Sequence, residues 1–183
     1  MTVERTGEAH ELGEQLTVVG AQLQPGDAAP DFTLEYMDPS DNALRQVRLA
    51  DSAGQVRLLN VINSIDTPVC HVETRRWERR RRELPESVLV LTVSMDLPFA
   101  QARWHSAEQV SHKSLSAHKS EQFGIDYGVL IKEWRLLQRS VFVIDGNGRI
   151  VHCEYVADQM LEPDYDAAIA AALATAKADA TRS

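Results

Sequence analysis

Cysteine is scarce in this sequence: among 183 residues there are only two, Cys70 and Cys153. Two cysteines allow at most one bridge and form no Cys-x-x-Cys pair, so a disulfide framework and a zinc-finger type of site are excluded. No apolar stretch approaches the length of a membrane span, and the N-terminus has no apolar core of the signal-peptide type. We therefore expect a protein of the reducing cytoplasm, with no membrane partner, in which a free thiol persists.

Positive charge is also in deficit, because 19 Lys and Arg face 27 Asp and Glu, which gives a net charge of −8. This balance argues against nucleic acid as a partner of the whole protein. One run has the opposite sign, with six arginines between positions 75 and 82. Glutamates at 73, 78 and 83 interleave with them, a mixture typical of the solvated face of a helix. A docking face for a partner is the alternative interpretation.

The hydrophobic fraction of 44% is ordinary for one globular domain. Nearly unbroken apolar runs predict buried strands at residues 56–62, 88–94 and 140–144. Residues 31–36 alternate like a half-buried strand, and the Asp-Gly-Asn-Gly turn at 145–148 predicts a hairpin partner at 149–155. Helices are expected at 67–84, 98–110, 121–127 and 162–174, the last with a buried stripe of Tyr165, Ile169 and Leu173. The stretch from 98 to 139 is interpreted as irregular and helical.

The order of these elements predicts the fold class. Strand, helix and strand between residues 56 and 94 imply a right-handed parallel crossover, followed by a hairpin and a closing helix. This arrangement fits a thioredoxin-like α/β domain, a mixed central sheet with helices on both faces. We expect the domain to cover residues 23–174, with an N-terminal extension at 1–22 that forms a β-hairpin and a frayed tail at 175–183.

Cys70 stands where a cysteine is most easily ionised. Thr67 is predicted to be a helix N-cap because Pro68 follows it at the first helical position. Cys70 then lies in the first turn, beside free backbone N–H groups and the positive end of the helix dipole. A thiol there ionises below its ordinary pKa of about 8.5, and the thiolate is a nucleophile. The alternative is an inert cysteine that packs as a small hydrophobe.

Four segments together resemble the peroxiredoxins. Residues 26–32 (GDAAPDF) are similar to the family's opening, and residues 66–70 (DTPVC) to its Thr-x-x-Cys loop. Residues 94–101 (SMDLPFAQ) and 162–165 (EPDY) are similar to signatures of the thiol peroxidase subgroup. The resemblance covers about residues 18–173. It implies a peroxiredoxin version of the thioredoxin-like fold and the reduction of hydrogen peroxide or organic hydroperoxides.

The resemblance also implies roles for three residues. Cys70 would attack the peroxide and become a sulfenic acid. The Thr67 hydroxyl would hold the thiolate and the peroxide, and the Arg139 guanidinium would stabilise the developing negative charge. The alternatives are a plain helix cap for Thr67 and a solvated strand-end charge for Arg139, with Arg135 an equal candidate on sequence alone. No cofactor is implied. A metal pair of Cys70 and His71 is not expected, since adjacent helical side chains diverge.

Two positions depart from the family pattern. Family members usually carry proline seven residues before the peroxidatic cysteine, where this chain has Asn63. The subgroup normally has a resolving cysteine where this chain has His105. Cys153 is interpreted as a small core residue of the returning strand and not as a substitute. The sulfenic acid would then be resolved by an outside thiol, from thioredoxin, a glutaredoxin or a small thiol.

The family implies a homodimer, formed across the face near the active site. A non-catalytic redox sensor, or a binding protein on the same fold, is the alternative function. The losses at Asn63 and His105 motivate that alternative.

Overall fold

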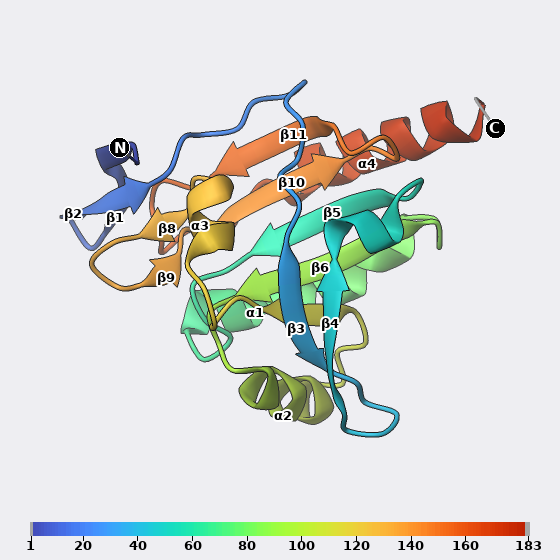
Figure 1. The fold of residues 1–183 in the computed structure, drawn as a ribbon, viewed down its shortest axis with the longest axis horizontal. Coiled ribbons are helices and arrows are strands. Elements are labelled where there is room, and N and C mark those ends of the chain that lie inside the picture. The colour runs from blue at the N-terminus through green and yellow to red at the C-terminus, as the bar shows by residue number, and fades with distance from the viewer. Residues whose placement is uncertain (1, 182–183) are drawn as a thin grey trace.

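A seven-stranded mixed sheet is the centre of the computed structural model, which describes residues 2–181 (Figure 1). Its strand order is β11-β10-β5-β6-β7-β3-β4. Strands β5, β6 and β7 are parallel to one another, and the remaining neighbours are antiparallel. The strands are β3 (Thr33–Met37), β4 (Leu44–Arg48), β5 (Val56–Val61), β6 (Val88–Ser94), β7 (Lys113–Ser116), β10 (Ser140–Ile144) and β11 (Ile150–Tyr155).

The three apolar runs form the buried middle of this sheet, which confirms their prediction as strands. Every residue of β5 and of β10 is buried. Neighbouring side chains on β5 point to opposite faces, so Leu58 and Leu59 belong to two different apolar clusters. A core therefore lies on each side of the sheet, and both faces need a cover.

Helices supply those covers. The helices are α1 (Pro68–Arg80), α2 (Pro98–Glu108), α3 (Gln122–Asp126) and α4 (Tyr165–Ala180), with short 3-10 helices η1 (Leu49–Ser52) and η2 (Arg81–Glu83). Trp77 of α1 and Tyr165 of α4 pack together on one face, with ring centroids 4.8 Å apart. Phe123 of α3 packs in the core on the other face. Helix α3 is drawn in front of the sheet in Figure 1. The predicted mixed sheet with helices on both faces is confirmed.

The N-terminal hairpin is present and belongs to a second, smaller sheet. Strands β1 (Glu4–Glu11) and β2 (Glu14–Val19) pair antiparallel. They continue through β8 (Leu130–Ile131) and β9 (Leu136–Leu137) in the order β1-β2-β8-β9. Gly20 closes this region: its φ is +101°, and an added Cβ would lie 2.0 Å from the Ile125 carbonyl oxygen. No side chain fits there, so the hairpin docks tightly beside α3.

Two parts of the sequence interpretation were wrong. The stretch from 98 to 139 is not only irregular and helical, because it contains β7, β8 and β9. The last helix starts at Tyr165, after an Asp164 N-cap whose carboxylate accepts from the Ala167 N–H, and it runs to Ala180 instead of ending at 174. Residues of the predicted frayed tail are thus helical up to Ala180, while residues 182–183 lie outside the described part.

The physical reason for the longer helix is its composition and one anchor. Alanine is the strongest helix former, and it dominates the last turns of α4. The Asp179 carboxylate accepts a hydrogen bond from the Gly146 backbone N–H at 3.1 Å, which ties the helix end to the β10–β11 turn. The predicted stripe is also corrected: Tyr165 and Ile169 are buried, but Leu173 is 40% exposed and Ala172 takes its place in the core.

Candidate active site

Cys70 is the third residue of α1, the helix that follows β5. Thr67 is the N-cap with extended backbone dihedrals and Pro68 follows it, as predicted. The Cys70 side chain is fully buried in a small apolar cluster with Ile62, Ile65, Trp104 and Val110. Because the first N–H groups of a helix have no intrahelical partner, the sulfur sits at the positive end of the α1 dipole. Burial alone would describe an inert cysteine, so its polar neighbours decide what it can do.

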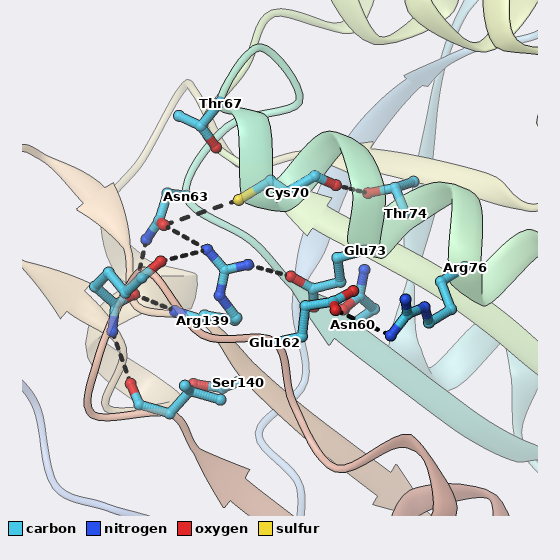
Figure 2. A network of polar contacts seen from close by, with 12 residues as sticks. Asn60, Asn63, Thr67, Cys70, Glu73, Thr74, Arg76, Arg139, Ser140 and Glu162 are labelled. Carbon is cyan, nitrogen blue, oxygen red and sulfur yellow. Dashed lines mark hydrogen bonds and ion pairs between the residues drawn. The ribbon is translucent and has the colours of Figure 1, made fainter. Parts of the chain in front are cut away.

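Arg139 is the charged neighbour of that sulfur. It immediately precedes β10 and is 1% exposed. Its Nη1 forms an ion pair with Glu73 Oε2, one turn beyond Cys70 on α1, and its Nη2 donates to the Gln159 carbonyl oxygen at 2.8 Å (Figure 2). Burial opposes the positive charge of Arg139, but Glu73 and the Cys70 sulfur raise its pKa above the ordinary value. A permanent cation therefore faces the buried thiol.

Glu73 completes a buried ion pair. Its side chain is 0% exposed, and burial raises the pKa of its carboxyl while the Arg139 charge opposes that rise. Its second oxygen, Oε1, has no hydrogen-bond partner among the described residues. The pair fixes the guanidinium beside α1, which is the role of a positioning group. Arg135, the alternative to Arg139, instead lies on the surface, where it pairs with Glu121 at 2.9 Å.

Asn63 reaches the same centre. Cys70 Sγ donates to Asn63 Oδ1 at 3.8 Å, and Arg139 Nη2 donates to the same oxygen at 3.3 Å. Asn63 Nδ2 donates to the Leu137 carbonyl oxygen at 2.6 Å and to Gln159 Oε1 at 3.0 Å. The position where the family usually has proline thus carries a fully engaged amide.

The Thr67 hydroxyl points toward the sulfur from the start of α1 (Figure 2). It donates to the Ser64 carbonyl oxygen at 2.9 Å and makes no capping bond of its own. Its donor is therefore occupied, and its oxygen lone pairs face the site as acceptors.

A pocket of about 260 Å³ opens beside these groups. Its polar lining comes from Asn63, Thr67, Arg139, Gln159 and Glu11, and its apolar lining from Pro68, Val69, Trp134, Leu136 and Met160. The pocket joins the helix start to the guanidinium, and it is large enough for a small molecule of mixed polarity.

His105 and Cys153 stand apart from this centre. His105 is half-buried: its Nε2 bonds to Ser114 Oγ at 2.5 Å and its Nδ1 to the Val110 carbonyl oxygen. Burial lowers the pKa of His105 to about 4. Cys153 is half-buried on β11, and its thiol donates to the Leu23 carbonyl oxygen at 3.3 Å. Both cysteines are free thiols.

The arginine run, His71 and the metal and membrane possibilities have separate outcomes. The arginine run of α1 and η2 is largely paired, with Arg75, Arg76, Arg80 and Arg81 in ion pairs to acidic residues. The His71 ring accepts the Trp104 N–H at 3.0 Å. Within residues 2–181 no group of three or more His, Cys, Asp or Glu side chains is arranged to hold a metal ion. Over the same residues, none of the helices has the length and apolar character needed to cross a membrane.

Sequence reasoning missed Glu73 and Gln159. Glu73 carried a usable signal, since it follows Cys70 by three residues and so shares its helix face. Gln159 carried none, because it comes from the loop before α4 and reaches the site only through the tertiary fold. Its Oε1 accepts from the Arg139 backbone N–H at 2.9 Å, and its Nε2 donates to the Val156 carbonyl oxygen at 2.7 Å.

A mixed sheet covered on both faces, with a buried cysteine at a helix start facing a buried arginine, defines a thioredoxin-like domain of the peroxiredoxin type. Comparison with known proteins agrees. The chain matches the AhpC/TSA family over residues 25–153, and it belongs to that family.

The curated relatives are similar along almost their whole length. The thiol peroxidase of Streptococcus sanguinis is 48% identical over 161 residues, which cover 87% of this chain and 95% of that protein. The thiol peroxidase of Bacillus subtilis is 46% identical over 166 residues, 90% of this chain and 96% of its own. Among solved structures, a peroxiredoxin-like protein from Aquifex aeolicus superposes with a TM-score of 0.78 at 30% identity, covering 92% of this chain and 95% of that one.

Proposed function

We propose that this protein is a thiol-dependent peroxidase that reduces hydrogen peroxide or organic hydroperoxides through Cys70. The observation that carries the proposal is the buried Cys70 sulfur at the start of α1 next to the Arg139 charge. Arg139 and Thr67 also line the neighbouring pocket. Relatives of nearly equal length carry the name thiol peroxidase, which supports the same chemistry.

The reaction follows from these groups. The Cys70 thiolate attacks the nearer peroxide oxygen, a sulfur–oxygen bond forms, and the oxygen–oxygen bond breaks. Sulfur is oxidised by two electrons to a sulfenic acid, and the departing oxygen leaves as water or an alcohol after it takes a proton. Arg139 stabilises the negative charge on that oxygen. Because the Thr67 donor is occupied by Ser64, its oxygen accepts the peroxide O–H.

The pocket suggests the substrate class. Trp134, Leu136 and Met160 give the pocket apolar lining, while Thr67 and Arg139 give it polar lining. A peroxide with an alkyl substituent would place its oxygens against the polar residues and its carbon chain against the apolar ones. We propose that organic hydroperoxides of modest size are accepted as well as hydrogen peroxide.

An outside thiol is proposed to complete the cycle. His105 stands where the subgroup has its resolving cysteine, and Cys153 is engaged with Leu23. A thiol from thioredoxin, a glutaredoxin or a small molecule would attack the sulfenic acid and release water, and a second thiol would then release Cys70. A homodimer in the reducing cytoplasm is the assembly and compartment that we propose. Sedimentation showing only monomer would refute the dimer.

Peroxide consumption tests the function. The protein should consume hydrogen peroxide and an alkyl hydroperoxide over many turnovers when a dithiol or reduced thioredoxin is supplied. Cys70→Ser should reduce turnover to the background rate. Cys153→Ser is the matched control and should keep the rate. Wild-type turnover no faster than that of Cys70→Ser would refute the proposal.

A further inference from the structure

Asn63 meets the reactive sulfur with its amide oxygen. The side chain is 4% exposed and lies in the loop after β5, seven residues before Cys70. Figure 2 shows dashed lines from the Asn63 amide oxygen to both the Cys70 sulfur and the Arg139 guanidinium. Its oxygen is 3.8 Å from Cys70 Sγ and 3.3 Å from Arg139 Nη2.

The direction of this amide is fixed by its neighbours. At the nitrogen end stand two acceptors, the Leu137 carbonyl oxygen and Gln159 Oε1. A rotated amide would place oxygen against those acceptors and nitrogen against a guanidinium that can only donate. Gln159 cannot rotate to compensate, because its own oxygen accepts from the Arg139 N–H and its nitrogen donates to Val156. The oxygen of Asn63 must therefore face the sulfur.

An acceptor in that place distinguishes the two forms of the cysteine. A thiol donates its S–H to the amide oxygen, whereas a thiolate has no proton to give and is repelled by that oxygen. The same oxygen accepts a hydrogen bond from an Arg139 N–H that could otherwise donate to a thiolate. Both effects are strong because the groups are shielded from water. A proline at this position would bring no side-chain acceptor.

We propose that Asn63 is a positioning residue that favours the thiol form of Cys70 and thereby sets the rate and pH dependence of its oxidation. The proposal deepens the proposed function, on which it rests for the identity of the attacking atom. It also gives a physical meaning to the departure from the family pattern, since the site keeps its cysteine, threonine and arginine but adds a side-chain acceptor beside the sulfur.

Two substitutions of opposite effect test it, in a Cys153→Ser background so that one thiol remains. The ultraviolet absorbance of the thiolate is followed against pH, with Cys70→Ser as the blank. Asn63→Leu removes the acceptor and should lower the pH midpoint of Cys70 ionisation by about one unit. A shift of this size corresponds to the energy of one modest hydrogen bond. Asn63→Asp keeps an acceptor and adds negative charge, so its midpoint should rise. Asn63→Pro, a second variant without a side-chain acceptor, should shift in the direction of the leucine variant.

Asn60→Leu is the matched control. Asn60 is also a buried asparagine, on β5, but it bonds to Thr92 and its oxygen has no partner among the described residues. Its loss should leave the midpoint unchanged. If Asn63→Leu and Asn63→Asp shift the midpoint in the same direction, or if neither shifts it, Asn63 has only a structural role and the inference is overturned.

Oxidation by peroxide then separates this inference from the proposed function. At a pH below the midpoints of both proteins, Asn63→Leu has about ten times more thiolate than the protein with Asn63. Because a less basic thiolate is a weaker nucleophile, its oxidation should be only about three to four times faster. Opposite shifts of the midpoint without peroxide consumption in any variant would sustain the role of Asn63 and reject the peroxidase. Peroxide consumption through Cys70 with an unchanged midpoint in the Asn63 variants would support the peroxidase and reject the role of Asn63.

Discussion

The buried pair of Glu73 and Arg139 makes a quantitative prediction possible. Their side chains are 0% and 1% exposed, so each charge depends on the other for compensation. We consider Glu73→Leu, Arg139→Met and the double variant, in which both charges are replaced by apolar side chains of similar size. The quantity of interest is the coupling between the two substitutions in the free energy of unfolding.

The magnitude follows from what each variant leaves behind. Either single substitution strands one charge away from water, which lowers the free energy of unfolding by about 3–5 kcal/mol. The double variant strands neither charge, although Gln159 and Asn63 lose the donors that Arg139 supplies. The double variant should therefore lose about as much free energy of unfolding as one single variant, and not the sum of both. We expect a coupling energy of about 3 kcal/mol.

Urea denaturation measures these energies, with the fluorescence of the buried Trp77 and Trp104 as the signal. The surface pair of Lys132 and Glu4 is the matched control: its side chains are 56% and 49% exposed, and it should couple by at most about 1 kcal/mol. Effects of Glu73→Leu and Arg139→Met that add to within about 0.5 kcal/mol would refute the buried ion pair.

Three further results are expected. Although partial burial opposes ionisation, hydrogen bonds from His112 and Ser111 hold the pKa of Glu78 well below its ordinary range. This stabilisation is complete above the unfolded pKa of about 4.3 and is lost as pH falls, so Glu78→Gln should flatten the acid limb of the unfolding free energy, measured in urea at a series of acidic pH values. By thermal melting, Ile169→Ala should cost about 2–5 kcal/mol, whereas the exposed Leu173→Ala should cost under about 0.5 kcal/mol; equal losses would contradict the corrected stripe.

The strands that the sequence predicts are those whose own residues require burial. In β5, β6 and β10 most side chains are apolar, and these strands form the middle of the sheet. Strand β7 (Lys113–Ser116) is mostly polar, and it is a strand only because β6 and β3 supply hydrogen-bond partners on both sides. Strands β8 and β9 have two residues each, too few for any periodic pattern.

In the site, too, local sequence patterns predict some residues, whereas the tertiary fold alone places others. Local rules predict a helix start at Thr67 and Pro68, with Cys70 in the first turn. The structure places the N-cap at Thr67, as those rules predict. Arg139 was selected over Arg135 only through the family resemblance, because neither position carries a distinguishing local pattern. The amide of Gln159 and the direction of the Asn63 side chain depend on four segments meeting in space, which a linear pattern does not encode.

In the proposed cycle peroxide oxidises the Cys70 sulfur, and no partner cysteine within the chain resolves the product. The most direct test is mass spectrometry of the intact and digested protein after substoichiometric hydrogen peroxide, with a sulfenic-acid trap present. We predict a trapped sulfenic acid on Cys70, unmodified Cys153 and no internal disulfide. An unmodified Cys70, or a bridge between Cys70 and Cys153, would contradict this cycle.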